Sequence, residues 1–291
     1  MNRFAALFLA LTITLVTVSS TCAAAVNEPF HFTLQAKGGT DRIEANFSRD
    51  RGNNHNRWNS SFSAAQLPGL DQNSFRGSGS NAIRFALNRE SGRLDCSGVG
   101  GNSRASGQCY YSPSQAFAAA LAANGIPTVG SEDWLSLFAL DVRRSLIDAV
   151  RAANYPSPTV EQLVSMTAVG VTGPYIEALA RAGYRPKSLD TLVEFKAIGV
   201  EPEWIAGLTR AGYSRLPSDE LVQLKALGVD GSYIQGFTAI GYRNLSASEL
   251  VQMKALGVTA DFARRVQGRL GPVSPDKLVE LRAIGFDIDR R

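Results

Sequence analysis

The strongest constraint on the fold is a repeat that fills the second half of the chain. A Leu-Val pair recurs at steps of 29, 29, 29 and 28 residues, and a glycine follows each pair at a constant distance. The pairs begin at Leu163, Leu192, Leu221, Leu250 and Leu278, and the glycines are Gly170, Gly199, Gly228, Gly257 and Gly285. A fixed period of this size marks tandem units that bury their apolar faces only against their neighbours. We therefore expect a solenoid, an architecture suited to binding surfaces and spacers.

Each unit reads as two short helices. In one unit, Leu221, Leu224 and Leu227 follow helical spacing, and Gly228 has the place of a C-terminal stop. A second helix is expected to begin after Asp230 and to stop at Gly241. Capping-box pairs support the first-helix boundaries. These pairs are Thr159 with Gln162, and Ser246 with Glu249. The sequence thus predicts an α-solenoid of helical hairpins with a period of about 29 residues.

Both ends of the repeat region are atypical. At the start, Trp134-Leu135 takes the place of a Leu-Val pair and Asp141 that of a stop glycine. At the end, the last unit is expected to be a lone helix from Pro275 to Ile284. Terminal units that meet a different surface commonly diverge in this way. The solenoid is therefore expected over residues 132–291, as about five and a half units, with a helical linker over residues 114–131 before it.

Residues 26–113 carry a different pattern. Apolar residues alternate with polar ones, as in Phe30, Phe32 and Leu34, which indicates strands with one buried face. We expect five or six antiparallel strands, and so an α+β multidomain protein. The polar segment from Arg49 to Trp58 is expected to be a solvated hairpin tip. The glycine-rich stretch from Gly98 to Gly107 is expected to be a long, loose linker.

Residues 1–25 resemble a cleavable export signal, with Arg3 before an apolar run and small residues after it. The alternatives are a membrane anchor, for which the run is short, and lipid attachment at Cys22. After cleavage two cysteines remain, Cys96 and Cys109, which predicts one disulfide in an oxidising compartment, either periplasmic or extracellular. Such a bond would add about 3 kcal/mol. Two reduced, buried thiols are the alternative.

Composition narrows the function classes only slightly. Without Arg3, 29 basic residues balance 26 acidic ones, which is too even to demand a nucleic acid or an anionic membrane as partner. His31 and His55 are the only histidines, and neither belongs to a zinc-binding pattern. No nucleophile elbow or phosphate-binding loop with a following helix is present. We therefore expect no metal, no cofactor and no catalytic residues.

Stacked units place equivalent residues in columns. One column is aromatic and the other is basic. The aromatic column is Tyr155, Tyr184, Tyr213 and Tyr242, and the basic column is Lys196, Lys225, Lys254 and Arg282. Together they could form a basic ridge that holds an acidic or polymeric partner. The alternative is that the tyrosines seal each unit against the next while the cations are merely solvated.

The repeat also resembles a known module. The unit Leu-Val-x-Leu-Lys-Ala-Leu-Gly-Val, followed by Tyr-Ile and Gly-Tyr, is similar to repeats in the extracytoplasmic part of some bacterial antirepressor metalloproteases of the beta-lactam-sensor type. The segments 83–92 and 112–117 resemble the strand region before those repeats. The protease of that family has a His-Glu-x-x-His motif on membrane-embedded helices, and this chain has neither. The resemblance implies a sensor-side module that binds or transmits.

The sequence therefore favours an exported, non-enzymatic binding or scaffold protein whose repeats engage a protein or an envelope polymer. The alternative is nucleic-acid binding, because a helix, a short turn and a second helix resemble helix-hairpin-helix modules. Those modules place a Gly-hydrophobic-Gly turn against phosphate, whereas this chain has Ala in the first place, as in Ala168-Val169-Gly170. An enzyme is the least favoured class, since no catalytic cluster is visible.

Overall fold

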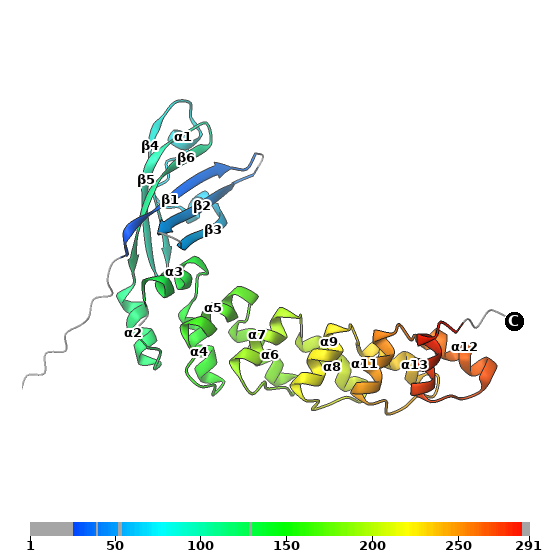
Figure 1. The fold of residues 1–291 in the computed structure, drawn as a ribbon. Helices are drawn as coiled ribbons and strands as arrows, with labels where there is room; N and C mark the ends of the chain where they lie inside the picture. Colours follow the sequence, from blue (N-terminus) through cyan, green and yellow to red (C-terminus); the bar gives the residue numbers. More distant parts are fainter. Residues whose placement is uncertain (1–25, 39, 52–53, 128–129, 287–291) are drawn as a thin grey trace, which may run out of the picture.

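The computed structural model describes residues 26–38, 40–51, 54–127 and 130–286. The predicted export signal lies outside the described residues. The predicted fold class is confirmed: a six-stranded antiparallel sheet with one disulfide precedes an array of short helices. Figure 1 shows the sheet standing at one end of a helical rod, with the C-terminal helices at the other end.

The sheet has the strand order β3-β2-β1-β6-β5-β4, and all neighbours are antiparallel. The strands are β1 (Val26–Ala36), β2 (Arg42–Arg51), β3 (Asn54–Ser63), β4 (Asn81–Arg89), β5 (Gly92–Gly101) and β6 (Arg104–Pro113), and a short helix α1 (Gln72–Arg76) lies between β3 and β4. Phe30, Phe32 and Leu34 are buried while His31 is exposed, so the alternation does mark one core face. The 3-10 turn η1 (Ala64–Gln66) follows β3.

The β5–β6 hairpin confirms the disulfide and corrects the expected loose linker. Cys96 and Cys109 are directly paired across the strands and are bonded. The strands continue to Gly101 and Arg104, and both turn residues, Asn102 and Ser103, have positive φ. The glycines serve close approach here: a Cβ on Gly98 would lie 2.0 Å from the carbonyl oxygen of Ser106.

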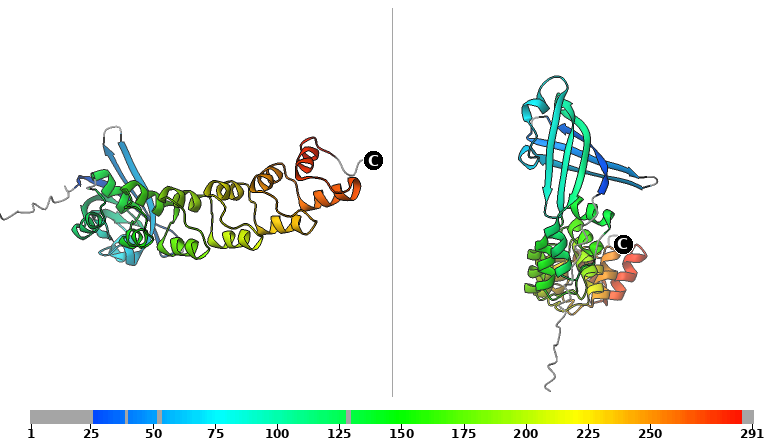
Figure 2. Two further views of the ribbon diagram at one scale, coloured as in Figure 1. Left: turned by 90° about the horizontal axis from the view of Figure 1, so that it is seen from below. Right: turned by 90° about the vertical axis from the view of Figure 1, so that its left-hand side faces the viewer.

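Twelve helices follow the sheet in the described part of the chain. They are α2 (Gln115–Ala123), α3 (Ser131–Ala139), α4 (Arg144–Ala152), α5 (Val160–Val169), α6 (Gly173–Arg181), α7 (Leu189–Ala197), α8 (Pro202–Arg210), α9 (Ser218–Ala226), α10 (Gly231–Thr238), α11 (Ala247–Ala255), α12 (Ala260–Leu270) and α13 (Pro275–Ala283). From α3 onward they alternate as first and second helices of a unit. First helices pack on first helices and second helices on second helices, so the rod has two rows (Figure 2).

Local chemistry explains why each hairpin turns where it does. At the end of α5, Gly170 adopts a left-handed conformation with φ of 82°. The N–H groups of Gly170 and Val171 donate to the carbonyls of Thr167 and Met166, which satisfies the helix end. Asp141 has φ of 56° at the equivalent place after α3, as its role as substitute stop predicts. Side-chain caps on Thr172 and Asp230 begin the second helices that follow.

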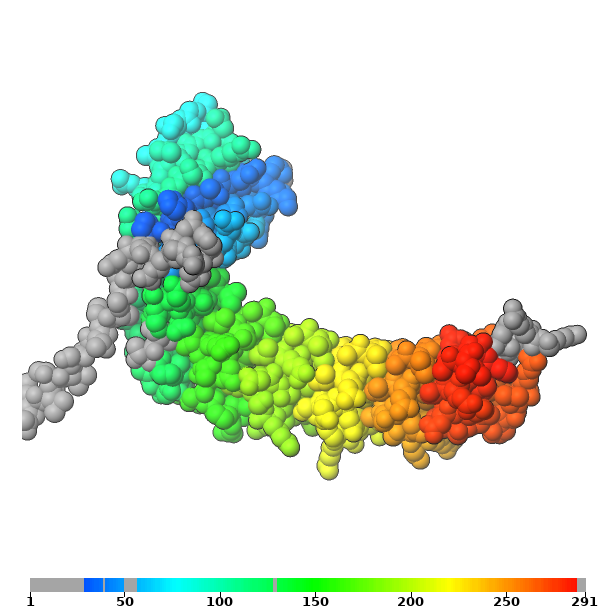
Figure 3. All heavy atoms as spheres, in the orientation of Figure 1, coloured from blue at the N-terminus to red at the C-terminus, as the bar shows by residue number. Residues whose placement is uncertain are grey.

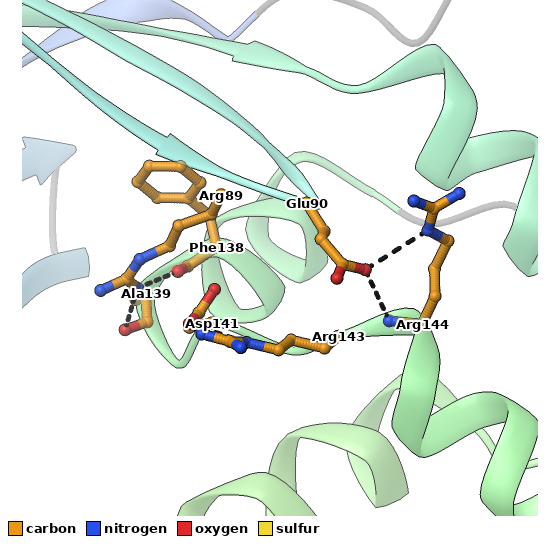
Figure 4. Close-up of polar contacts among 7 residues, drawn as sticks. All are labelled: Arg89, Glu90, Phe138, Ala139, Asp141, Arg143 and Arg144. Carbon is orange, nitrogen blue, oxygen red and sulfur yellow. Dashed lines mark hydrogen bonds and ion pairs between the residues drawn. The ribbon is translucent and has the colours of Figure 1, made fainter. Parts of the chain in front are cut away.

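The β4–β5 turn joins the sheet to the first unit of the rod (Figure 4). Arg89 donates to the carbonyls of Phe138 and Ala139 at the end of α3, and its guanidinium lies over the Phe138 ring. Glu90 accepts from the backbone N–H of Arg144 at the start of α4, at 2.8 Å. One turn thus satisfies a helix C-terminus and a helix N-terminus together. The sheet thereby caps the solenoid, which accounts for the divergent first unit.

A second contact at this junction corrects the expectation of a solvated tip over Arg49–Trp58. Arg49 is 2% exposed, and its guanidinium lies 2.5 Å from a carboxylate oxygen of Glu132. Trp58 is half-buried and stacks on Phe47, with ring centroids 4.5 Å apart. The burial of Arg49 and Trp58 could not be predicted from this polar segment, because it depends on contacts with α3, which is distant in sequence.

The helices were also compared with the length of a membrane span. Within the described ranges, no single helix is both long and apolar enough to cross a membrane. The pair α5 and α6 passes the same test jointly, although the two are bent by 77° at their break.

Candidate binding surfaces of the solenoid

The basic column lies on a second, unexpected column of aromatic rings. Each cation, on the first helix of one unit, lies over a ring on the second helix of the unit before it. The pairs are Lys196 on Tyr175 at 4.5 Å, Lys225 on Trp204 at 5.2 Å, Lys254 on Tyr233 at 4.4 Å, and Arg282 on Phe262 at 5.4 Å, measured to ring centroids. These distances are within the range of cation–π attraction.

Lys196 and Lys225 pass close to the stop glycines of the preceding units on the way to their rings. A Cβ placed on Gly170 or Gly199 would lie 3.9 or 3.7 Å from the Cε of Lys196 or Lys225. Lys196 also forms an ion pair with Glu201 at 2.6 Å and is only 22% exposed. Three of the four cations are half-buried, and only Arg282 is exposed. The structure thus gives the basic column an inter-unit packing role, while binding of a partner by it stays a prediction.

We expect the Lys254–Tyr233 pair to couple two units by about 0.5–1 kcal/mol. In a double-mutant cycle, Lys254→Met and Tyr233→Leu should together cost less than the sum of the single changes, because either change already removes the attraction. Urea unfolding followed by circular dichroism measures the four free energies. The matched control pairs Lys254→Met with Tyr175→Leu, which lies three units from Lys254 and should show no coupling. A Lys254–Tyr233 coupling as small as that of the control would contradict the assignment.

The tyrosine column connects units through hydrogen bonds. The hydroxyls of Tyr155, Tyr213 and Tyr242 donate to backbone carbonyls of the next inter-unit loop, at Pro186, Leu245 and Val273. The Tyr184 hydroxyl bonds the Ser218 hydroxyl at 2.9 Å. The column thus lies at the seams between units, and no partner-binding role follows from this geometry.

The second aromatic column makes the same kind of bridge at the opposite ends of the helices. Tyr175, Trp204 and Tyr233 donate to the carbonyls of Val200, Val229 and Val258 of the following unit, at 2.7, 3.0 and 2.8 Å. The sequence alone did not single out these three rings as a column. The available signal was the constant offset of 21 residues between each of these rings and the lysine that covers it.

We expect the rod to lose stability above about pH 10, the ordinary tyrosine value. Burial raises the pKa of Tyr155, Tyr175, Tyr213, Tyr233 and Tyr242 above that value. The unfolded chain therefore releases protons first as pH rises, so the free energy of unfolding is constant below pH 10 and falls above it. Urea midpoints against pH should fall together with the appearance of tyrosinate absorbance. Ionisation of these five tyrosines near pH 10 with the helical signal intact would contradict this.

The loop edge of the rod, where second helices end and first helices begin, was not singled out from the sequence. Arg185, Lys187 and Arg215 are exposed there, around a cavity of about 750 Å³ between two units. Among the described residues, Lys187 and Arg215 form neither an ion pair nor a side-chain hydrogen bond. These cations differ from the basic column in being free to meet a partner.

Across residues 26–38, 40–51, 54–127 and 130–286, no group of three or more His, Cys, Asp or Glu side chains is placed to hold a metal ion. Glu90, which has no visible partner in the sequence, serves the junction described above. The surfaces with chemistry to interpret are thus the three columns and the loop edge.

Similarity to known proteins adds nothing to the interpretation of these surfaces. No family model, curated protein or solved structure matches the chain.

Proposed function

We propose that this protein is an exported, non-enzymatic scaffold whose helical repeats engage a protein or cell-envelope partner, as a sensor-side module without a protease. The observation that carries the proposal is the ladder of bridges between units. At the three central inter-unit steps, a ring hydroxyl or indole N–H, a tyrosine hydroxyl and a covering cation link one hairpin to the next. Repeated bridges make a continuous rod, which presents a long surface in fixed register.

The sheet supports this proposal by giving the rod a fixed base. Arg89 and Glu90 bind two helix ends of the first unit, and Arg49 pairs with Glu132. A partner bound along the rod would therefore be held at a set position relative to the sheet. Transmission of binding from one part to the other needs such a connection.

The compartment is part of the same proposal. Disulfides persist in oxidising compartments and are uncommon in the cytosol of most organisms. The Cys96–Cys109 bond, with a signal-like stretch over residues 1–25, supports export.

The nucleic-acid alternative receives less support. In helix-hairpin-helix modules the N–H groups of the turn approach phosphate, whereas here those of Gly199 and Val200 donate to the carbonyls of Lys196 and Phe195. Carboxylates of Glu201 and Asp230 occupy the start of two second helices, where they repel phosphate. Both features favour a partner other than DNA or RNA.

The proposal is tested by affinity capture with the protein expressed from its full sequence. Tagged protein is incubated with envelope extract of the source cells, and bound protein and polymer are identified by mass spectrometry and sugar analysis. We expect saturable, stoichiometric recovery of a partner that survives moderate salt. DNA recovery that falls steeply with salt would favour the alternative. Recovery equal to that of an unrelated tagged protein would refute the proposal.

A further inference from the structure

Three cavities with shared lining residues lie at the loop edge of the rod. The cavity of about 750 Å³ is lined by the loops 183–187 and 215–219 and by the outward side of α9. A neighbour of about 200 Å³ shares Tyr184 and Arg185 with it, and another of about 150 Å³ shares Tyr184 and Arg215. We call these three cavities together the loop trough. In Figure 3 the sheet stands clear of the yellow-green to yellow part of the rod, to which these residues belong.

The cations of the loop trough are not required by the repeat. Positions equivalent to Arg185 are Pro156, Ser214 and Arg243, those equivalent to Lys187 are Pro158, Leu216 and Leu245, and those equivalent to Arg215 are Ser157, Pro186 and Asn244. The helices of these units begin and end at equivalent places without a cation there. The solenoid thus supplies its own comparison, and only the trough gathers three cations.

The backbone conformation of Arg215 is also strained. Its φ is 59°, in the left-handed region, where the equivalent Asn244 has φ of 56°. Asparagine tolerates this conformation, whereas other non-glycine residues are strained by about 1 kcal/mol. Strained residues that persist concentrate at functional sites. A solvated arginine at this position is better explained by a ligand than by packing.

The remaining lining decides the class of ligand. Glu194 and Asp219 also line the largest cavity, beside the apolar side chains of Leu216, Pro217 and Val222. A polyphosphate or sulfated glycan would meet two carboxylates there and gain little from the apolar wall. An acidic polypeptide can place its carboxylates on the cations, its N–H groups on Glu194 and Asp219, and its apolar side chains on the wall.

We propose that the loop trough binds an extended polypeptide segment in which acidic residues stand beside apolar ones. The proposal rests on the scaffold function above and names the surface and the kind of partner. Arg185, Lys187 and Arg215 hold the carboxylates, and the two smaller cavities, which are lined by second helices, accept apolar side chains. The basic column contributes little, because its lysines are already held on aromatic rings.

The test uses a display library of short random peptides, selected on the immobilised full protein at physiological ionic strength. We expect enrichment of peptides that carry Asp or Glu next to apolar residues. A synthetic peptide of the enriched sequence should bind the triple variant Arg185→Glu, Lys187→Glu, Arg215→Glu at least about tenfold more weakly. A peptide with its acidic residues replaced by lysine should recover binding to that variant, which excludes misfolding as the cause.

The matched control reverses three exposed cations of the sheet, Arg57→Glu, Arg84→Glu and Arg104→Glu, and should leave peptide binding within about twofold. Selected peptides without acidic bias, or equal binding by both triple variants, would overturn the proposal. So would trough-dependent binding of heparin, polyphosphate or anionic vesicles that the peptides do not displace. A partner captured by wild type and by the trough variant alike would leave the scaffold function standing and remove this surface from it.

Discussion

Replacing Phe195 with alanine should lower the free energy of unfolding by about 3–5 kcal/mol. Phe195 lies on α7 and is fully buried, with its ring centroid 5.4 Å from that of Tyr184 in the unit before. The change removes packing inside one unit and across one seam. Phe195 combines complete burial with a contact to the preceding unit, so the effect should be among the largest in the rod.

The form of the unfolding curve is as informative as its midpoint. In a solenoid each unit is stabilised by its neighbours, so a weak seam near the middle should separate the rod into two cooperative parts. We expect the single transition of the wild type to become two. Hydrogen exchange should show α9 to α13 opening before the sheet and α3. The units next to the sheet remain stabilised by their contacts with it, while α9 to α13 have no such contacts among the described residues.

Val193→Ala is the matched control on the same helix. Val193 is half-buried, so its truncation should cost about 1 kcal/mol and leave one transition. If Phe195→Ala also left one transition, shifted by no more than the control, stability in this rod would not be transmitted between nearest neighbours.

The period of the chain was enough to predict the rod. Equal spacing of Leu-Val pairs and stop glycines determines the unit, and Asp141 and the lone α13 were visible as departures from it. Such signals are local, because the cap, the stop and the apolar stripe of a helix all lie within one unit. Local chemistry is what a single sequence displays best.

Contacts between units were only partly predictable. The tyrosine and lysine columns were found because equivalent positions repeat, but the rings that the lysines cover belong to a different position of the preceding unit. Their pairing depends on how far one hairpin is displaced against the next. That displacement follows from packing, which the period alone does not specify.

The glycine-rich hairpin shows a different limit. Flexibility and close approach both favour glycine, and the sequence does not separate them. Gly98 and Gly107 lie in paired strands, and a Cβ on Gly107 would lie 2.2 Å from the carbonyl oxygen of Ser97. A run of glycines that suggested a loose tip is instead a requirement of two tightly apposed strands.

The candidate site was the least predictable part. The sequence drew attention to the basic column, because its members align, and passed over the cations of the loop trough, because they do not. In a repeat protein, alignment is also what packing demands, so a repeated charge is often a structural one. A charge that occurs in only one unit is the better indicator of a ligand, and Lys187 is of that kind.

The junction between sheet and rod gives the second large expected effect. Arg49 is buried, its guanidinium lies 5.1 Å from the centre of the Phe30 ring, and its Nε has no hydrogen-bond partner among the residues that the structure describes. Glu132 supplies the opposite charge at 2.5 Å. Glu132→Gln keeps the shape of the side chain but leaves the guanidinium charge without its carboxylate. We expect a loss of about 3 kcal/mol, because an uncompensated buried charge costs more than a removed one.

The same reasoning predicts that Arg49→Met costs much less than Glu132→Gln, and that Arg49→Met in the Glu132→Gln background restores most of the lost stability. Methionine fills the space beside Phe30 without a charge to compensate. Thermal unfolding measures the relative stabilities of the three variants, and near-ultraviolet circular dichroism reports the packing around Trp58. A greater loss for Arg49→Met than for Glu132→Gln would mean that the packing of the Arg49 side chain, rather than its pairing with α3, holds the sheet on the rod.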